Sequence, residues 1–156
     1  MANYEPRFHV VLHQPEIPGN TGAIGRTCVA LEAKLWLVRP LGFQVDEKTL
    51  RRAGLDYWQY LEWEVVDNWQ MLLDKVAGRV WTFSKTATQS FDEADFCTGD
   101  WLVFGSETRG LPSSILQNPD FRCLRIPTSS LVRSLNLSCA VAVAGYQVHR
   151  SITLTR

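Results

Sequence analysis

The stretch Phe8–Gly22, FHVVLHQPEIPGNTG, contains in miniature the pattern that decides the fold. The apolar run Phe8–Leu12 predicts a buried strand, and the proline-rich segment after it ends that strand. Asn20 is then predicted to cap a helix that continues to about Ala33, because apolar residues recur there at helical spacing. A buried strand followed by a helix is the repeating unit of an α/β domain.

The same alternation continues along the chain. Further strands are predicted at Leu35–Val38, Leu61–Val66, Val80–Phe83, Trp101–Phe104 and Cys123–Ile126. Further helices are predicted at Trp69–Val76 and from about Ser134 to Arg150. This order predicts an α/β fold with a mostly parallel sheet flanked by helices. The length of 156 residues fits a single domain over residues 1–156.

The composition is that of a globular protein, with 46% apolar and 21% charged residues. Because 16 basic residues balance 16 acidic ones, a nucleic-acid surface would require local concentration of positive charge. The four cysteines are far apart and show no metal-ligand spacing, which predicts buried or half-buried free thiols and no metal. The sequence lacks a signal-peptide pattern and an apolar run of ~18 residues, so we expect a cytoplasmic protein without a membrane partner.

Familiar nucleotide-site motifs are absent from the sequence. It contains no G-x-G-x-x-G, G-x-x-x-x-G-K-[ST] or G-x-S-x-G pattern, which removes support for Rossmann, P-loop and serine-hydrolase sites. Three breaks rich in glycine, proline or asparagine stand out instead, at Pro18–Arg26, Gly105–Pro112 and Pro127–Ser138. Ligands of open α/β sheets bind beyond the carboxyl ends of strands, where such loops gather. Taken alone, the breaks predict a small-molecule site.

The three breaks resemble, in order, the three motifs of the SPOUT methyltransferases. The matching segments are Pro15–Gly22 with Arg26, Phe104–Pro112, and Arg125–Pro127 followed by Arg133–Ser138. Two other segments, Pro40–Phe43 (PLGF) and Leu50–Tyr57 (LRRAGLDY), resemble the TrmL branch of that family. Together these motifs extend over nearly the whole chain.

The resemblance implies a SPOUT fold with a C-terminal deep trefoil knot and a homodimer formed through the knot helices. It implies S-adenosylmethionine-dependent 2′-O-methylation of the ribose at tRNA position 34, a cytidine or modified uridine, with the anticodon stem-loop as partner and no metal. Three alternatives stay open. The same chemistry could act on another tRNA position or on rRNA. The chain could instead be a non-catalytic RNA-binding module, or a small-molecule transferase that does not depend on RNA.

The resemblance also assigns the cofactor contacts, mainly through backbone groups of the loops. These positions are Phe83, Gly105, Ile126, Ser134 and Leu135. A missing Cβ lets backbone approach a ligand closely, which favours glycine at such a position. The simpler alternatives are that Gly105 only ends a strand and that Ile126 is only a core residue.

The resemblance places the active centre at Arg26, Asn20, Glu107, Asn136 and Tyr146. Arginine is a poor base at neutral pH, so Arg26 is expected to bind the adjacent phosphate and polarise the ribose hydroxyl. Catalysis would then depend mainly on positioning the hydroxyl in line with the methyl group. The alternatives are that Asn20 only caps its helix, that Glu107 is a surface carboxylate, and that Tyr146 is a core aromatic.

Phosphate neutralisation supplies most of the affinity of proteins for RNA. The candidate RNA contacts lie in or beside the motifs, at Lys48, Arg51, Arg52, Arg109 and Arg133. Much of the acidic charge lies elsewhere, in residues 62–74 and 92–100. This separation predicts one positive face on a chain without net charge, whereas the alternative is that each basic residue is simply solvated.

Overall fold

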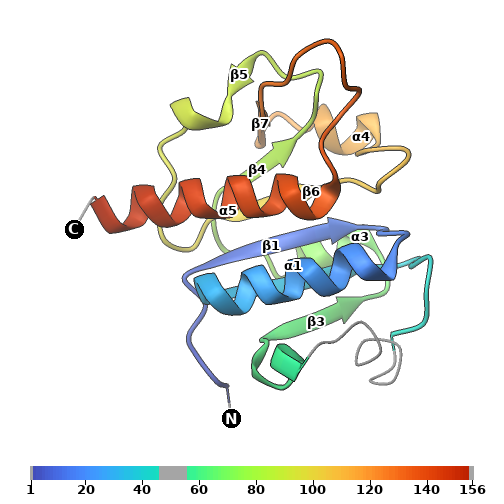
Figure 1. Ribbon diagram of the computed structural model, residues 1–156, viewed down its shortest axis with the longest axis vertical. Coiled ribbons are helices and arrows are strands. Elements are labelled where there is room, and N and C mark those ends of the chain that lie inside the picture. The colour runs from blue at the N-terminus through green and yellow to red at the C-terminus, as the bar shows by residue number, and fades with distance from the viewer. Residues whose placement is uncertain (1, 46–55, 155–156) are drawn as a thin grey trace.

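A computed structural model describes residues 2–45 and 56–154 of the chain (Figure 1). The strands are β1 (Phe8–His13), β2 (Ala33–Val38), β3 (Trp63–Val66), β4 (Val80–Phe83), β5 (Gln89–Ser90), β6 (Trp101–Phe104) and β7 (Arg122–Arg125). The α-helices are α1 (Pro18–Leu31), α3 (Trp69–Leu73), α4 (Ser113–Leu116) and α5 (Leu137–Leu154). Two short 3₁₀ helices, η1 (Asp56–Tyr60) and η2 (Phe91–Glu93), complete the described elements.

The strands form one seven-stranded sheet in the order β3-β2-β1-β6-β4-β7-β5. Every pairing between these strands is parallel, so the predicted parallel sheet is confirmed. β1 lies near the middle, where Phe8 pairs with Ala33 of β2 and Leu12 pairs with Phe104 of β6. Central strands of a parallel sheet are buried on both faces, which explains their continuous apolar runs.

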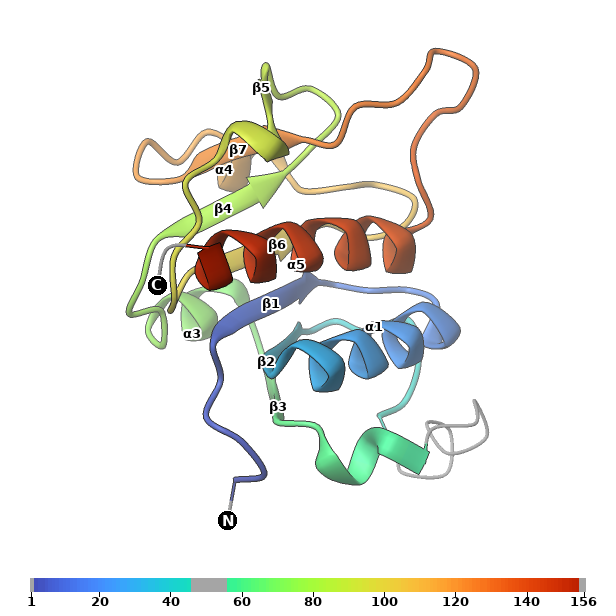
Figure 2. The same ribbon diagram turned by 60° about the vertical axis from the view of Figure 1, so that its left-hand side comes forward.

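Helices cover both faces of this sheet. α1 and α5 lie side by side over one face, and both begin at the edge where the strands end (Figures 1 and 2). Ile24 of α1 and Val141 of α5 are buried in one core with residues such as Leu12 of β1. The short helices α3 and α4 contribute to a second core on the opposite face. The predicted layers of an α/β fold are therefore present.

The contact between α1 and α5 is close because a glycine lies in it. A Cβ at Gly145 of α5 would lie 2.8 Å from Cδ1 of Leu31 in α1. The apolar residues of α5 that face the core, Val141, Ala144 and Val148, recur at the helical spacing expected from the sequence.

The prediction that Asn20 caps the first helix is wrong. The helix begins at Pro18, with Ile17 at the N-cap position. Proline suits the first turn of a helix because its missing N–H would have no partner there, and its φ is already helical. Asn20 therefore lies inside the first turn, and its side chain is free to bond elsewhere.

Other boundaries also differ from the sequence expectation. α3 ends at Leu73 and not at Val76, while α5 begins at Leu137 and extends to Leu154. The short elements β5 and α4 were not predicted, since two to four residues show no periodicity. The knot that the resemblance implies remains a prediction.

All four cysteines are free thiols, as predicted. Cys28 is buried and Cys123 partly buried, whereas Cys97 and Cys139 are exposed, so burial was predicted correctly for only two of them. Burial raises the pKa of the Cys28 thiol. Among the described residues, no helix is long and apolar enough to cross a membrane.

A glycine-to-alanine change in α1 tests how this helix packs. A Cβ at Gly25 would lie 2.5 Å from Cζ3 of Trp58 in η1, whereas a Cβ at Gly19 would meet no atom within 4 Å. We expect Gly25→Ala to lower the free energy of unfolding by about 1–3 kcal/mol through overpacking. The control, Gly19→Ala, should change it by less than about 0.5 kcal/mol. Urea denaturation measures both, and equal effects would contradict the packing.

Candidate functional site

A cavity of about 580 Å³ opens at the carboxyl ends of β4, β6 and β7. It is lined by the strand-end residues Phe83 and Phe104 and by the loops that follow the three strands. This is the edge of an open parallel sheet where ligands of α/β proteins bind. The three sequence breaks therefore meet at one cavity, since residues of all three contribute to its lining.

Every position that the resemblance assigns to the cofactor lines this cavity. These residues are Phe83, Gly105, Ile126, Ser134 and Leu135. Ile126 also packs against the core, so its two interpretations hold together. The rings of Phe83 and Phe104 are stacked, with centroids 4.6 Å apart and planes 12° from parallel. They give the cavity an aromatic wall suited to a flat apolar group.

Gly105 is required by a close approach of two backbones. A Cβ at this position would lie 2.1 Å from the carbonyl carbon of Gly110 and 2.3 Å from the nitrogen of Leu111. The loop folds back on itself, because the N–H of Gly110 donates to the carbonyl oxygen of Ser106 at 3.0 Å. Gly110 has a φ of +67°, a left-handed conformation that glycine adopts readily. Gly105 therefore does more than end a strand.

Glu107 connects the second motif to the first. Its Oε1 accepts a hydrogen bond from the N–H of Glu16 at 2.9 Å, and its Oε2 accepts one from the N–H of Ile17 at 2.8 Å. The Asn20 amide also donates to Oε2, at 3.2 Å. These N–H groups lie at the start of α1, where a negative charge is favoured by the helix dipole. The alternative that Glu107 is only a surface carboxylate does not fit these contacts.

Asn20 and Asn136 extend the network to the third motif. The Asn136 side-chain amide donates to Oδ1 of Asn20 at 3.1 Å, and Asn20 is only 9% exposed. Oδ1 of Asn136 accepts from the N–H of Ser138 at 2.9 Å, so Asn136 also caps the start of α5. Glu107, Asn20 and Asn136 all line the cavity. One chain of hydrogen bonds thus joins the three motifs.

Arg26 and Tyr146 do not line the cavity. Arg26 is exposed on α1, and its guanidinium carbon lies 4.9 Å from the centroid of the Tyr57 ring. The Tyr57 hydroxyl donates to the carbonyl oxygen of Gly22 in α1. Tyr146 is 54% exposed on α5, so the alternative that it is a core aromatic is wrong. Their catalytic assignments stay predictions, and both side chains lie on the solvent side of the helix layer.

The candidate RNA contacts divide into two groups. Arg109 and Arg133 are exposed and line the cavity. The other three, Lys48, Arg51 and Arg52, lie outside the described residues.

Sequence reasoning missed part of the cavity wall that follows β4. Ser84, Lys85 and Thr86 line the cavity, and the Ser84 side chain organises the turn by accepting from the N–H of Thr86 at 3.2 Å. The usable signal was position, since this turn follows a buried strand just as Gly105 does. Lys85 adds a third exposed cation to the lining. Within residues 2–45 and 56–154, no cluster of three or more His, Cys, Asp or Glu is arranged to hold a metal ion.

The cavity and its three motif loops match a known family. The model of the SpoU rRNA methylase family matches residues 7–146. A relative from Bacillus subtilis (strain 168) is 47% identical over 147 residues, which cover 92% of each chain. A relative from Saccharophagus degradans, named tRNA (cytidine(34)-2′-O)-methyltransferase, is 44% identical over 147 residues, covering 93% of this chain and 96% of its own.

Solved structures agree with this match. One, described as giving insights into the 2-OH methylation of C/U34 on tRNA, has a TM-score of 0.89 and 44% identity, covering 96% of this chain and 97% of its own. An AdoMet-bound rRNA methyltransferase from Sinorhizobium meliloti shares the fold, with a TM-score of 0.81 and 23% identity; it covers 96% of this chain and 58% of its own. The chain belongs to the SpoU rRNA methylase family, a methyltransferase family with the SPOUT fold.

The Glu107 network can be tested by an isosteric change. In Glu107→Gln an amide group replaces one carboxylate oxygen, so one backbone N–H at the start of α1 loses its acceptor. We expect a loss of about 1–3 kcal/mol in the free energy of unfolding. The matched control is Glu16→Gln, because its remaining oxygen can still accept both Thr108 donors. Thermal and urea unfolding measure both variants, and a fully stable Glu107→Gln protein would contradict the proposed contacts.

Proposed function

We propose that this protein transfers the methyl group of S-adenosylmethionine to the ribose 2′-hydroxyl of nucleotide 34 of a tRNA. One observation carries the proposal: the residues assigned to the cofactor and three assigned to the active centre surround a single cavity. The names of relatives at 43–44% identity over most of the chain support the wobble nucleotide as target. The AdoMet-bound neighbours with the same fold support the choice of donor.

The donor fits the cavity by its chemistry. Its adenine would lie against the aromatic wall of Phe83 and Phe104, within reach of backbone groups around Gly105 and Ile126. Ser134 and Leu135 would close the same pocket from the third motif. When bound, S-adenosylmethionine supplies an electrophilic methyl group on a sulfonium. The loops hold it by shape and main-chain hydrogen bonds, which needs no charged side chain.

The residues of the chain would act mainly by orientation. Transfer joins the 2′-oxygen to the methyl carbon and breaks the carbon–sulfur bond, whose electron pair stays on sulfur as S-adenosylhomocysteine forms. The hydroxyl proton leaves to solvent late in the reaction. Arg26 would bind the neighbouring phosphate and polarise the hydroxyl, because a guanidinium is a poor base at neutral pH. No metal enters this scheme.

The RNA would approach the cavity from its cationic rim. Lys85, Arg109 and Arg133 are exposed there, and each can neutralise a phosphate of an anticodon stem-loop. Lys48, Arg51 and Arg52 are inferred to extend this surface. A tRNA substrate and four free thiols both fit a cytoplasmic location.

We further infer a homodimer formed through the outer faces of α1 and α5. Val143, Tyr146 and Leu154 of α5 are 42%, 54% and 70% exposed, so within the part of the chain that the structure describes they form an apolar stripe at helical spacing that is open to solvent. Arg26 lies on the solvent side of the adjacent helix. A dimer through this face would explain why Arg26 and Tyr146 lie outside the cavity of their own chain: each would serve the partner subunit.

The first test is a methyl-transfer assay. Purified protein, labelled S-adenosylmethionine and bulk tRNA should yield a 2′-O-methylated cytidine or uridine at position 34, mapped by mass spectrometry. If only rRNA or another tRNA position is methylated, nucleotide 34 is not the target and the same chemistry acts on that other RNA site. Donor binding without transfer to any RNA would favour the non-catalytic binding module.

A glycine substitution tests the donor pocket. Gly105→Ala should raise the Kd for S-adenosylhomocysteine by at least ~10-fold, about 1.4 kcal/mol, because the added Cβ pushes the loop apart. The control is Gly99→Ala, in the turn that precedes β6 and therefore at the opposite end of the strand from Gly105. Gly99 has a φ of +89°, and no atom lies within 4 Å of the added Cβ. It imposes backbone strain away from the cavity and should leave the Kd unchanged. Titration calorimetry measures the Kd of both variants. Equal Kd values for Gly105→Ala and Gly99→Ala would show that the loop at Gly105 is not part of the donor pocket.

Subunit mixing tests the shared active centre. Arg26→Ala and Gly105→Ala chains with different tags are co-expressed and the heterodimer is purified. If Arg26 serves the partner's cavity, the cavity of the Arg26→Ala chain keeps its own Gly105 and receives Arg26 from the Gly105→Ala chain. One of the two sites is then intact, so about half of the wild-type rate returns. At an S-adenosylmethionine concentration well below the raised Kd of the Gly105→Ala protein, two copies of either variant alone should keep at most about a tenth of the wild-type rate. A heterodimer as inactive as its parents would place Arg26 with its own cavity.

A further inference from the structure

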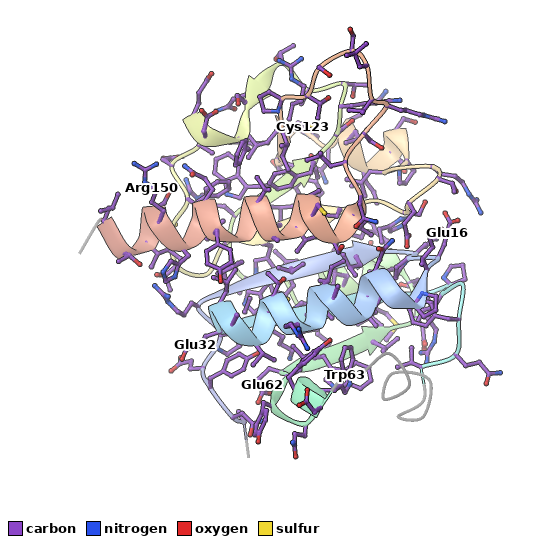
Figure 3. All side chains as sticks on the ribbon, in the orientation of Figure 1. Glu16, Glu32, Glu62, Trp63, Cys123 and Arg150 are labelled. Atoms are coloured by element: carbon purple, nitrogen blue, oxygen red, sulfur yellow. The ribbon has the colours of Figure 1, made fainter. Side chains whose placement is uncertain are left out.

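Glu16 and Thr108 make a second contact between the first and second motif loops. The Thr108 hydroxyl donates to Oε1 of Glu16 at 2.6 Å, and the Thr108 N–H donates to the same oxygen at 3.4 Å. Glu107, next to Thr108, accepts the N–H of Glu16 in return. Each of the two loops therefore supplies one carboxylate that accepts hydrogen bonds from the other loop. Figure 3 shows Glu16 at the end of the molecule where α1 and α5 begin, far from Arg150.

A third segment is seated on the backbone of Glu16. The N–H of Gly42 donates to the carbonyl oxygen of Pro15 at 2.9 Å. A Cβ at Gly42 would lie 2.5 Å from the carbonyl oxygen of Glu16 and 2.7 Å from its Cα. Segment 40–45, which follows β2 and immediately precedes the residues that include Lys48, is thus in direct contact with the loop that Thr108 holds.

Folding alone does not account for the Glu16 side chain. Glu107 already anchors the start of α1 through two backbone N–H groups, and Thr108 is exposed. A hydrogen bond near solvent adds little to stability. Thr108 does, however, line the cavity together with Ser106 and Arg109. The hydrogen bond from the Thr108 hydroxyl stabilises the ionised carboxylate and lowers the pKa of Glu16.

We propose that Glu16 is a positioning residue that holds the Ser106–Gly110 wall of the cavity in register with segment 40–45. This inference rests on the proposed function. The contact of Glu16 with Thr108 is assigned to the side where the donor binds, and its contact with segment 40–45 to the side where the RNA binds. None of the positions proposed to contact the donor bonds to Glu16. Loss of its carboxylate therefore disturbs the alignment of the two substrates more than the binding of the donor.

The test compares Glu16→Ala and Thr108→Val with the conservative variants Glu16→Gln and Thr108→Ser. The first pair should lower kcat for tRNA methylation by ~10-fold to ~100-fold, since small misplacements of reacting groups have effects of this size. The Kd for S-adenosylhomocysteine and the KM for tRNA should stay within ~3-fold, a change of less than ~1 kcal/mol. The conservative variants keep an acceptor or a hydroxyl and should restore kcat.

The double variant Glu16→Ala/Thr108→Val decides whether the two residues act together. Residues in one contact give non-additive effects, so the double variant should be no slower than the slower single variant. Multiplied effects, or an unchanged kcat in both single variants, would overturn the inference. Circular dichroism confirms that the variants are folded.

Hydrogen exchange gives a readout that does not depend on activity. Glu16→Ala should speed exchange of the amides of residues 106–110 and also of the Gly42 amide, which bonds to Pro15. Gly42→Ala, which pushes the third segment from its seat, should speed exchange in residues 106–110 from the other side. Unchanged exchange in both segments overturns the inference, whether or not the wild-type protein methylates tRNA. A wild-type protein that fails to methylate any RNA, but shows coupled exchange, instead refutes the proposed function alone.

Discussion

The carboxylate of Glu107 is the contact on which the rest of the cavity depends. It accepts hydrogen bonds from two backbone N–H groups at the start of α1 and from the side-chain amide of Asn20. These bonds fix the first motif to the second. Oδ1 of Asn20 in turn accepts a hydrogen bond from the side-chain amide of Asn136, which caps the start of α5. Because these groups come from three distant parts of the sequence, the cavity exists only in the folded chain. A charged acceptor suits the position, since it meets several donors at the positive end of a helix.

The sequence predicted the fold well where burial alone determines structure. Strands β1, β4 and β6 lie inside a parallel sheet, so their apolar runs show almost their full extent. Helix ends were predicted less well because tertiary contacts decide them. Asn20 has the side chain of a capping residue, but Glu107, 87 residues away, engages its amide, and Pro18 begins the helix. Local propensity is a weak guide where such a contact competes.

The site was predictable where a motif or a strand end marked it. Gly105 follows the buried strand β6 and Ile126 follows β7, and the sheet order places β4, β6 and β7 side by side. The turn at Ser84–Thr86 was missed because its local sequence carries no glycine or proline, although it occupies the equivalent position after β4. Arg26 lies two residues from the buried Ile24 and Cys28, and Tyr146 two residues from the buried Ala144 and Val148, so spacing places both on the outer faces of their helices. Spacing could not show where those outer faces lie relative to the cavity.

Most of the residues that line this cavity lie in the loops after β4, β6 and β7. Backbone N–H and C=O groups are the same in every residue, so the donor recognition that we propose would tolerate many substitutions provided that the loops keep their positions. The side chains that hold the loops are different, because each has a definite partner: Glu107 with α1, Asn136 with Asn20, and Glu16 with Thr108. Gly105 also has a definite partner, since any side chain there would collide with the backbone of Gly110 and Leu111 in the same loop. Chemistry built on main-chain groups therefore places its sequence requirements on the residues that orient the loops, and few of these need to touch the reacting atoms.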